Sequence, residues 1–401
     1  TAEKNDMTYN YRNKIAVLIK TILKYKRTTR DQLVKELGIK KSALVGYLNY
    51  LLKSSLILES GIQSSAGGGR KPVFIELNPK YGSILTVAVE KNRIISGLID
   101  LQGNCSAVLI EELSEIVEKE IFLEKIVCMI KKYSNLKNTT TILGVVVAIG
   151  GNVDSVAGVS LENLYIQNWN NIPLEKIIFE KTGYKTKIIK DIEALALGEL
   201  FFGNGVGLKH LISINLGYDV GMGIIANGEL YAGASDCAGE LGHIIVDPAG
   251  PLCYCGRNGC LEKMVSVETL IEKCKDGFRH GVHSRVLKYT QEYIDTLSIE
   301  AIINAVNEND VFTRKLFRES GEYIGKKLSE IVNLFNPEML CLRGALITNN
   351  NFLYTQIKDY IFSHSRFYNL QNLQITYPLN EEYITLKGAA SVMILLLPFA
   401  T

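Results

Sequence analysis

Along the first sixty residues, hydrophobic positions recur with the period of a helix. One run covers residues 11–26, where apolar residues fall three and four positions apart. A second helix is predicted over 30–37, because Thr29 and Gln32 have the spacing of a capping box. The same period returns over 41–53. Three short helices with a tight turn before the last one predict a helix-turn-helix.

The pattern then changes to that of strands. Residues 56–58 and 73–77 predict two strands, joined by the glycine-rich segment 59–72. A hairpin directly after a helix-turn-helix is the arrangement of a winged helix. We therefore expect residues 1–80 to form a winged helix-turn-helix DNA-binding domain.

From residue 84 onwards the chain alternates between strands and longer helices. Segments 84–92 and 93–104 predict a hairpin, 110–133 a helix, and 141–151 a buried strand that ends in glycines. This alternation is typical of an α/β fold.

Length and hydropathy restrict the class of protein further. A chain of 401 residues suggests two or three domains. No apolar run reaches membrane-spanning length, and the polar start has no signal-peptide core. We expect a cytoplasmic protein without membrane insertion.

The charge is unevenly distributed. Residues 1–80 contain 15 Lys and Arg against 6 Asp and Glu, whereas the remainder contains 29 against 36. A basic head on an acidic body predicts that the head binds a polyanion, which for a winged helix is double-stranded operator DNA. A protein-interaction module is the alternative for the same three helices.

The first turn of the helix over 41–53 is expected to face the major groove. Small residues there allow a close approach, and the others can donate to phosphates or base edges. The tip of the wing is expected in a minor groove. The DNA-binding candidates are Lys40, Lys41, Ser42, Ala43, Gly46 and Tyr47, with Arg70 and Lys71 at the tip.

Between residues 239 and 262, a histidine and three cysteines lie in a loop rich in glycine. One imidazole and three thiolates are a complete ligand set for tetrahedral zinc, and a site with four protein ligands is structural. A redox-active cysteine pair is the alternative. The candidate ligands are His243, Cys253, Cys255 and Cys260.

This loop resembles the signature of the ROK family (repressors, open reading frames and sugar kinases), which reads ExGH followed by CxCGxxGCxE. Residues 240–243 and 253–262 match every position. The resemblance implies a two-lobed actin-like, ribonuclease-H-like ATPase fold. Lobe 1 is then expected over 81–190 with the C-terminal helix 381–401, and lobe 2, with the zinc loop, over 191–380.

The chain departs from the ROK kinases at three nucleotide-binding segments. The DxGxT phosphate loop is replaced by residues 87–92, which contain no glycine. The second loop, GTGxGxG in the kinases, carries Tyr218 and Asp219, and a Gly-Gly pair is Arg343 and Gly344 here. A phosphate loop needs close backbone approach and free N–H donors. The resemblance therefore implies that the chain is not an enzyme.

The sugar-binding segments of the family are better retained. Residues 150–174 resemble PGxVDxxxGxVxxxxNLxW, and 190–199 resemble NDxNxxALGE, with Lys190 and Glu193 in place of the two asparagines. Carboxylates suit sugars because each accepts bonds from neighbouring hydroxyls. The implied sugar contacts are Gly150, Gly151, Asp191, Glu240, His243 and Glu262.

The resemblance favours the repressor branch of the family, and within it the xylose-repressor type, because ROK kinases lack the N-terminal winged helix. We predict a sugar-responsive repressor of carbohydrate uptake or catabolism genes. It would hold a structural zinc, bind operator DNA as a homodimer or dimer of dimers, and be released by a small sugar in the interlobe cleft. Two alternatives remain: a sugar kinase with a regulatory DNA-binding head, and a repressor controlled by a transporter protein.

Overall fold

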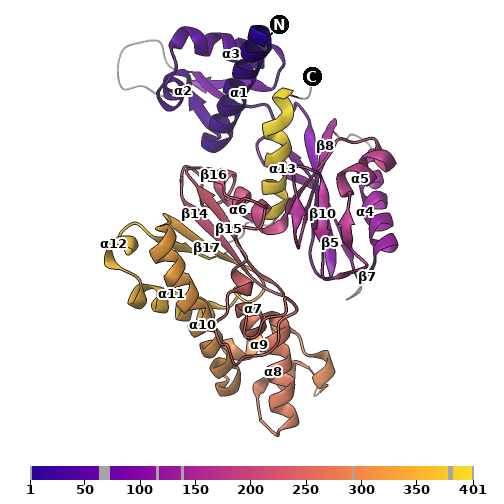
Figure 1. Cartoon of the computed structure of the whole chain (residues 1–401), viewed down its shortest axis with the longest axis vertical. Helices are drawn as coiled ribbons and strands as arrows, with labels where there is room; N and C mark the ends of the chain where they lie inside the picture. Colours follow the sequence, from indigo (N-terminus) through magenta and orange to yellow (C-terminus); the bar gives the residue numbers. More distant parts are fainter. Residues whose placement is uncertain are drawn as a thin grey trace. The chain divides into compact units, whose positions relative to one another are not determined.

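The chain forms two compact units (Figure 1). The computed structural model describes residues 2–62, 73–113, 117–136, 140–290, 293–377 and 383–399. Unit 1 comprises residues 1–207 and 383–401, and unit 2 comprises residues 208–382. Among the described residues, no helix is long and apolar enough to cross a membrane.

Unit 1 begins with three helices and a small sheet. They are α1 Ala2–Tyr25, α2 Arg30–Leu37 and α3 Lys41–Lys53, with β1 Arg27–Thr29, β2 Ile57–Ile62 and β3 Val73–Leu77 in the order β1-β3-β2. Helix α2 begins where predicted, since the hydroxyl of Thr29 accepts the backbone N–H of Gln32 at 3.3 Å. These described elements follow one another in the order expected of a winged helix. Strand β1 was not predicted, because three polar residues carry no strand pattern.

The rest of unit 1 is built around a five-stranded sheet. Its strands are β4 Ser83–Val89, β5 Arg93–Asp100, β6 Cys105–Glu112, β8 Ile142–Ile149 and β13 Thr186–Lys190, in the order β13-β8-β4-β5-β6. Strands β13, β8 and β4 are parallel to one another. Strand β5 is antiparallel to β4, and β6 is antiparallel to β5. Helices α4 Lys119–Ser134 and α5 Leu174–Thr182 cover one face. Helices α6 Asp191–Phe201 and α13 Ile384–Leu396 pack on the sheet from the other.

The predicted helix over 110–133 was wrong in its first third. Residues 105–112 form the edge strand β6, and α4 begins only at Lys119. The apolar residues of this stretch match either period, and pairing with β5 decides the outcome. Short strands complete this unit: β7 Val117–Glu118, β9 Val153–Asp154, β10 Val159–Glu162, β11 Ile166–Gln167 and β12 Asn170–Ile172.

Unit 2 repeats the sheet topology of unit 1. Its strands are β14 Leu211–Leu216, β15 Val220–Ala226, β16 Glu229–Leu230, β17 Met339–Arg343 and β18 Gln374–Thr376, in the order β16-β15-β14-β17-β18. Its α-helices are α7 Leu261–Val265, α8 Val267–Arg279, α9 Ile299–Asn307, α10 Val311–Phe335, α11 Asn351–His364 and α12 Phe367–Leu370. Two units with the same strand order and directions are the mark of the actin-like fold.

Helices α6 and α13 cross at very close range. A Cβ on Gly388 would lie 1.8 Å from the carbonyl oxygen of Ala194, and one on Gly198 would lie 2.3 Å from that of Ile384. Only glycine permits this contact, because the helix backbones themselves touch. The crossing packs α6 within unit 1, and unit 2 begins after residue 207.

Candidate functional site

The four predicted metal ligands lie together in unit 2. The ligand atoms of His243, Cys253, Cys255 and Cys260 are all within 4.8 Å of one another. The Sγ atoms of Cys255 and Cys260 are 3.5 Å apart, and Cys253 Sγ is 3.7 Å from His243 Nδ1. Tetrahedral zinc with Zn–S bonds of about 2.3 Å separates its ligands by roughly 3.7 Å. The donor set and its spacing therefore fit zinc.

The backbone of the metal loop is folded tightly on itself. Gly259 has φ 67°, and a Cβ there would lie 1.5 Å from the carbonyl oxygen of Asp247. Its N–H donates to the carbonyl of Pro251 at 2.9 Å. This turn places Cys260 directly before α7, and the short 3-10 helix Leu241–His243 places the imidazole opposite.

Tyr254 is a participant that the sequence analysis missed. Its hydroxyl lies 2.9 Å from His243 Nε2, which leaves Nδ1 to face the cysteines. The same hydroxyl hydrogen-bonds the carboxylate of Glu262. Metal-bound histidines usually have such a partner on the second ring nitrogen. No spacing signal marks Tyr254, because it occupies a variable position between two ligands.

The thiols of the loop have divergent pKa values. Burial raises the pKa of Cys260 to about 12, with a further rise from hydrogen bonds to the other two thiols. Burial also raises the pKa of Cys255, but hydrogen bonds from Arg257 and the neighbouring thiols outweigh it and lower the value to about 6. The lowered pKa of Cys255 favours the thiolate, which is the form that binds metal.

Two of the predicted sugar contacts flank the metal loop. Glu262 is 8% exposed, and burial raises its pKa to about 7, although the N–H of Val220 donates to its Oε2 at 3.0 Å. A Cβ on Gly242 would approach the same Oε2 to 3.2 Å. Glu240 is exposed at the start of the 3-10 helix.

The remaining sugar contacts lie together in unit 1. Asp191 begins α6 directly after β13, and Gly150 follows β8, which pairs with β13 in parallel. A Cβ on Gly150 would lie 3.6 Å from Asp191 Oδ2. The sequence analysis did not predict a role for Asn163, whose Nδ2 donates to the carbonyl of Gly150 at 3.1 Å. Gly151 has φ 82°, and a Cβ there would clash with the Glu162 carbonyl.

This group lies at the carboxyl ends of parallel strands, where ligands of open α/β sheets bind. We refer to Gly150, Gly151 and Asp191 as the unit 1 cluster.

Most of the predicted DNA contacts lie on the surface of α3 and the turn before it. Residues 40–43 are exposed, and Lys41 forms an ion pair of 2.7 Å with Asp31 of α2. Tyr47 is half-buried. Arg70 and Lys71 lie outside the described residues. Asn49 and Lys53 are exposed on α3 and were not predicted.

Both altered phosphate loops are bonded within themselves. In the first, the N–H of Glu90 donates to the carbonyl of Arg93 at 2.9 Å, and the two side chains form an ion pair of 2.6 Å. In the second, the N–H of Gly217 donates to the carbonyl of Asp219 at 3.1 Å, whose carboxylate accepts from Asn215 Nδ2 at 3.0 Å. These donors would not be free for a phosphate.

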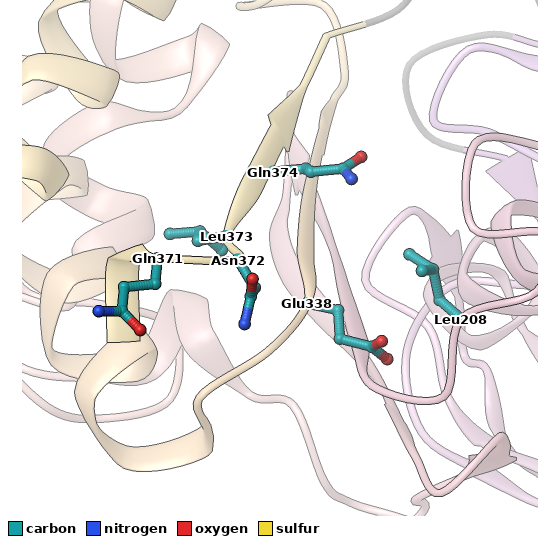
Figure 2. A pocket seen from close by; sticks show the side chains of 6 residues that line it. All are labelled: Leu208, Glu338, Gln371, Asn372, Leu373 and Gln374. Carbon is teal, nitrogen blue, oxygen red and sulfur yellow. The ribbon is translucent and has the colours of Figure 1, made fainter. Parts of the chain in front are cut away.

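A separate polar pocket of about 450 Å³ is present in unit 2 (Figure 2). It is lined by Leu208, Glu338, Gln371, Asn372, Leu373 and Gln374. Glu338 Oε2 already accepts the N–H groups of Lys209 and His210, each at 2.8 Å. The pocket lies at the amino ends of β14, β17 and β18, opposite to the usual ligand edge. We therefore do not assign the effector to it.

Comparisons with known proteins agree with this description. Residues 88–394 match the sequence model of the ROK family. The chain is 30% identical over 369 residues to a xylose repressor of Caldicellulosiruptor bescii, and the match covers 90% of each protein.

Two solved structures show the same fold. A ROK family transcriptional regulator, a homolog of the E. coli MLC protein, has a TM-score of 0.81 at 22% identity and covers 97% of this chain and 99% of its own. A ROK family glucokinase from Streptomyces griseus, in complex with glucose and AMPPNP, has a TM-score of 0.69 at 24% identity and covers 78% and 99%. From the family match over most of its length, the signature around the cysteine loop and the duplicated sheet, we conclude that this chain belongs to the ROK family.

Proposed function

We propose that this chain is a sugar-responsive transcriptional repressor. One observation carries the proposal: a winged-helix head precedes a ROK body, and a xylose repressor matches 90% of the chain. The self-bonded phosphate loops argue against the kinase alternative, because they leave no obvious cradle for ATP.

The proposed effector contacts begin with the unit 1 cluster. The carboxylate of Asp191 can accept from two neighbouring sugar hydroxyls, and such charge-assisted bonds are strong. The family resemblance adds Glu240, His243 and Glu262 of unit 2. The sugar can release the repressor from the operator only to the extent that it binds the DNA-free repressor more tightly than the DNA-bound repressor. A hundredfold loss of operator affinity requires that the free energy of sugar binding differ by about 2.7 kcal/mol between these two states.

Asp191→Asn should shift the response to sugar to at least tenfold higher sugar concentrations without removing DNA binding. The amide keeps the shape of the side chain but loses the charge that strengthens hydrogen bonds to hydroxyls, so effector affinity should fall at least tenfold. We would measure operator affinity in a mobility-shift titration with a panel of pentoses, hexoses and amino sugars.

Glu180→Gln, which removes an exposed carboxylate on α5, is the matched control and should respond like the wild type. If no sugar of the panel changes the operator affinity of the wild-type chain, the effector model is wrong.

We also propose that the metal loop holds one structural zinc through His243, Cys253, Cys255 and Cys260. The fit of the ligand spacing to a tetrahedron supports this proposal. The loop has little packing of its own to rely on, since Leu252 is 68% exposed and Tyr254 51%. Binding of the metal would replace the missing hydrophobic core.

Cys255→Ser should lose the zinc and lower the melting temperature. Removing a thiolate ligand opens the site, and the free energy of metal binding that contributes to folding is lost. Metal content per chain by mass spectrometry and thermal unfolding with and without a chelator measure both effects. Cys128→Ser, at an exposed cysteine of α4, should retain one zinc per chain. A wild-type protein purified without chelator and free of zinc would refute the proposal.

The chain should have no sugar kinase activity. By the family resemblance, Glu90 stands where the first phosphate loop of the kinases would approach the nucleotide. Its N–H is bonded to the carbonyl of Arg93 and would not be available to a phosphate. A coupled assay of ADP formation with ATP, magnesium and each sugar of the panel should not exceed the rate of heat-inactivated protein. Turnover at an ordinary enzymatic rate, typically 1–1,000 per second, would favour the alternative of a kinase with a regulatory head.

We further propose that the repressor is a homodimer, since one winged helix rarely buries enough DNA for specific binding. An exposed patch in unit 2 supports this: Leu334 is 78% exposed, Phe335 45%, Phe367 72% and Tyr368 76%. Hydrogen bonds between their neighbours, from Arg366 N–H to Asn333 Oδ1 and from Asn369 Nδ2 to the Val332 carbonyl, both 2.9 Å, hold α12 against the end of α10.

We name the four exposed residues Leu334, Phe335, Phe367 and Tyr368 the aromatic patch. At about 150–250 Å² for each fully exposed aromatic side chain, it presents on the order of 500 Å². A standard interface buries about 800 Å² of each partner. The aromatic patch could therefore supply most of the apolar core of an interface with a second copy of the chain.

Replacing Phe367 and Tyr368 together by serine should convert dimers to monomers at micromolar concentration. The change removes most of the apolar area that a partner copy would cover. Light scattering after size exclusion gives the mass directly. Phe179→Ser, at an aromatic residue of α5 that is 55% exposed, should leave the mass unchanged. A double variant that remains dimeric would show that the interface lies elsewhere.

A further inference from the structure

We propose that α3 recognises operator DNA through one stripe of four residues, Ser42, Gly46, Asn49 and Lys53. Gly46 is the point of closest approach to the major groove, and Asn49 selects an adenine. This inference rests on the proposed function, because it takes α3 as the helix that binds duplex DNA. We call the four residues the recognition stripe.

The stripe follows from the helical geometry of α3. Its members are four, three and four positions apart, which places them on one face of a helix. All four are exposed. The opposite face carries Leu44, Leu48 and Leu51, which are buried in the core of the head. The stripe is therefore the face of α3 that a partner molecule meets first.

Nothing in the described part of the chain requires a glycine at position 46. A Cβ at this position would meet no atom of the described residues within 4 Å, and Gly46 does not have a positive φ. Alanine would therefore fit, and it would strengthen the helix, because glycine is the weaker helix former. At Gly198 and Gly388, by contrast, a side chain would collide with backbone. The space above Gly46 thus serves a surface that comes from outside the chain.

Asn49 lies one turn beyond Gly46 and has the chemistry to read a base. Its carboxamide offers one acceptor and two donors, which match N6 and N7 of adenine in the major groove. Val45 beside it is 42% exposed and suits the methyl group of thymine. Lys53, in the last turn, is placed to contact a phosphate, which fixes the register of the helix without reading sequence.

The composition of the stripe favours DNA over a protein partner. Its centre is small and polar, whereas protein interfaces concentrate large apolar and aromatic residues at their core. Helix α3 contains no acidic residue, so nothing on it repels the phosphates. Asp31 of the neighbouring helix is already paired with Lys41.

The decisive variant is Gly46→Ala in the full chain. We expect its melting temperature to equal or exceed that of the wild type, because the helix is strengthened and nothing clashes. Its affinity for DNA should fall at least tenfold, because the added methyl group blocks the close approach. The DNA probe is the duplex that the wild-type chain enriches from a pool with a random 20-base-pair core.

Asn49→Ala tests the choice of base. Loss of one bidentate contact should weaken binding to the enriched duplex by about tenfold to a hundredfold. A repeated selection with this variant should lose its preference for A·T at one position of each half-site. Asn351→Ala, at an exposed asparagine that begins α11 of unit 2, is the control and should select the wild-type sequence.

The outcomes separate this inference from the function on which it rests. If the wild-type chain enriches no sequence, the proposed repressor function fails, and the recognition stripe fails with it. If the wild-type chain enriches a sequence but Gly46→Ala binds it equally well, or Asn49→Ala selects the same bases, α3 reads DNA through other residues and only the stripe is refuted.

Discussion

The contact between the backbones of α6 and α13 is the constraint on which unit 1 depends. Gly198 and Gly388 allow the two helices to touch without side chains between them. Helix α13 comes from the end of the chain and packs on β4 and β8, so this crossing joins the C-terminus to the sheet. Asp191 is the first residue of α6, and it lies beside Gly150 because β13, which precedes it, pairs in parallel with β8.

The crossing also gives the proposed switch a physical route. Helix α1 of the head contacts both α6 and α13 within unit 1. No side chains separate α6 from α13 at the crossing. A displacement of one helix is therefore expected to displace the other, because close-packed interiors transmit strain. A ligand that displaces Asp191 would therefore displace the surface on which α1 rests. Coupling of this kind needs an element with two discrete arrangements, so the proposed switch requires a second position of this helix pair.

The sequence predicted best what is decided locally. The bounds of α2 and α3 followed from Thr29, Gly38 and the apolar period, and the four metal ligands fall within eighteen residues of one another. Contacts between distant segments were harder to predict. The helix period failed at β6, where pairing with β5 outweighs local propensity. The proximity of Gly150 and Asp191 was implied by family resemblance alone, since it depends on the parallel pairing of β8 with β13.

The metal loop and the altered phosphate loops fit a binding protein better than a catalyst. Tyr254 links His243 to Glu262, so closure of the loop on a metal would also fix a buried carboxylate. A carboxylate held in this way can bind a hydroxyl, and Asp191 has the same capacity. To act as a base in phosphoryl transfer, either would need a phosphate donor held in line. The segments that would hold it are bonded to themselves through Glu90, Arg93 and Asp219. The proposed role of these carboxylates, to bind a sugar without phosphorylating it, follows from that self-bonding.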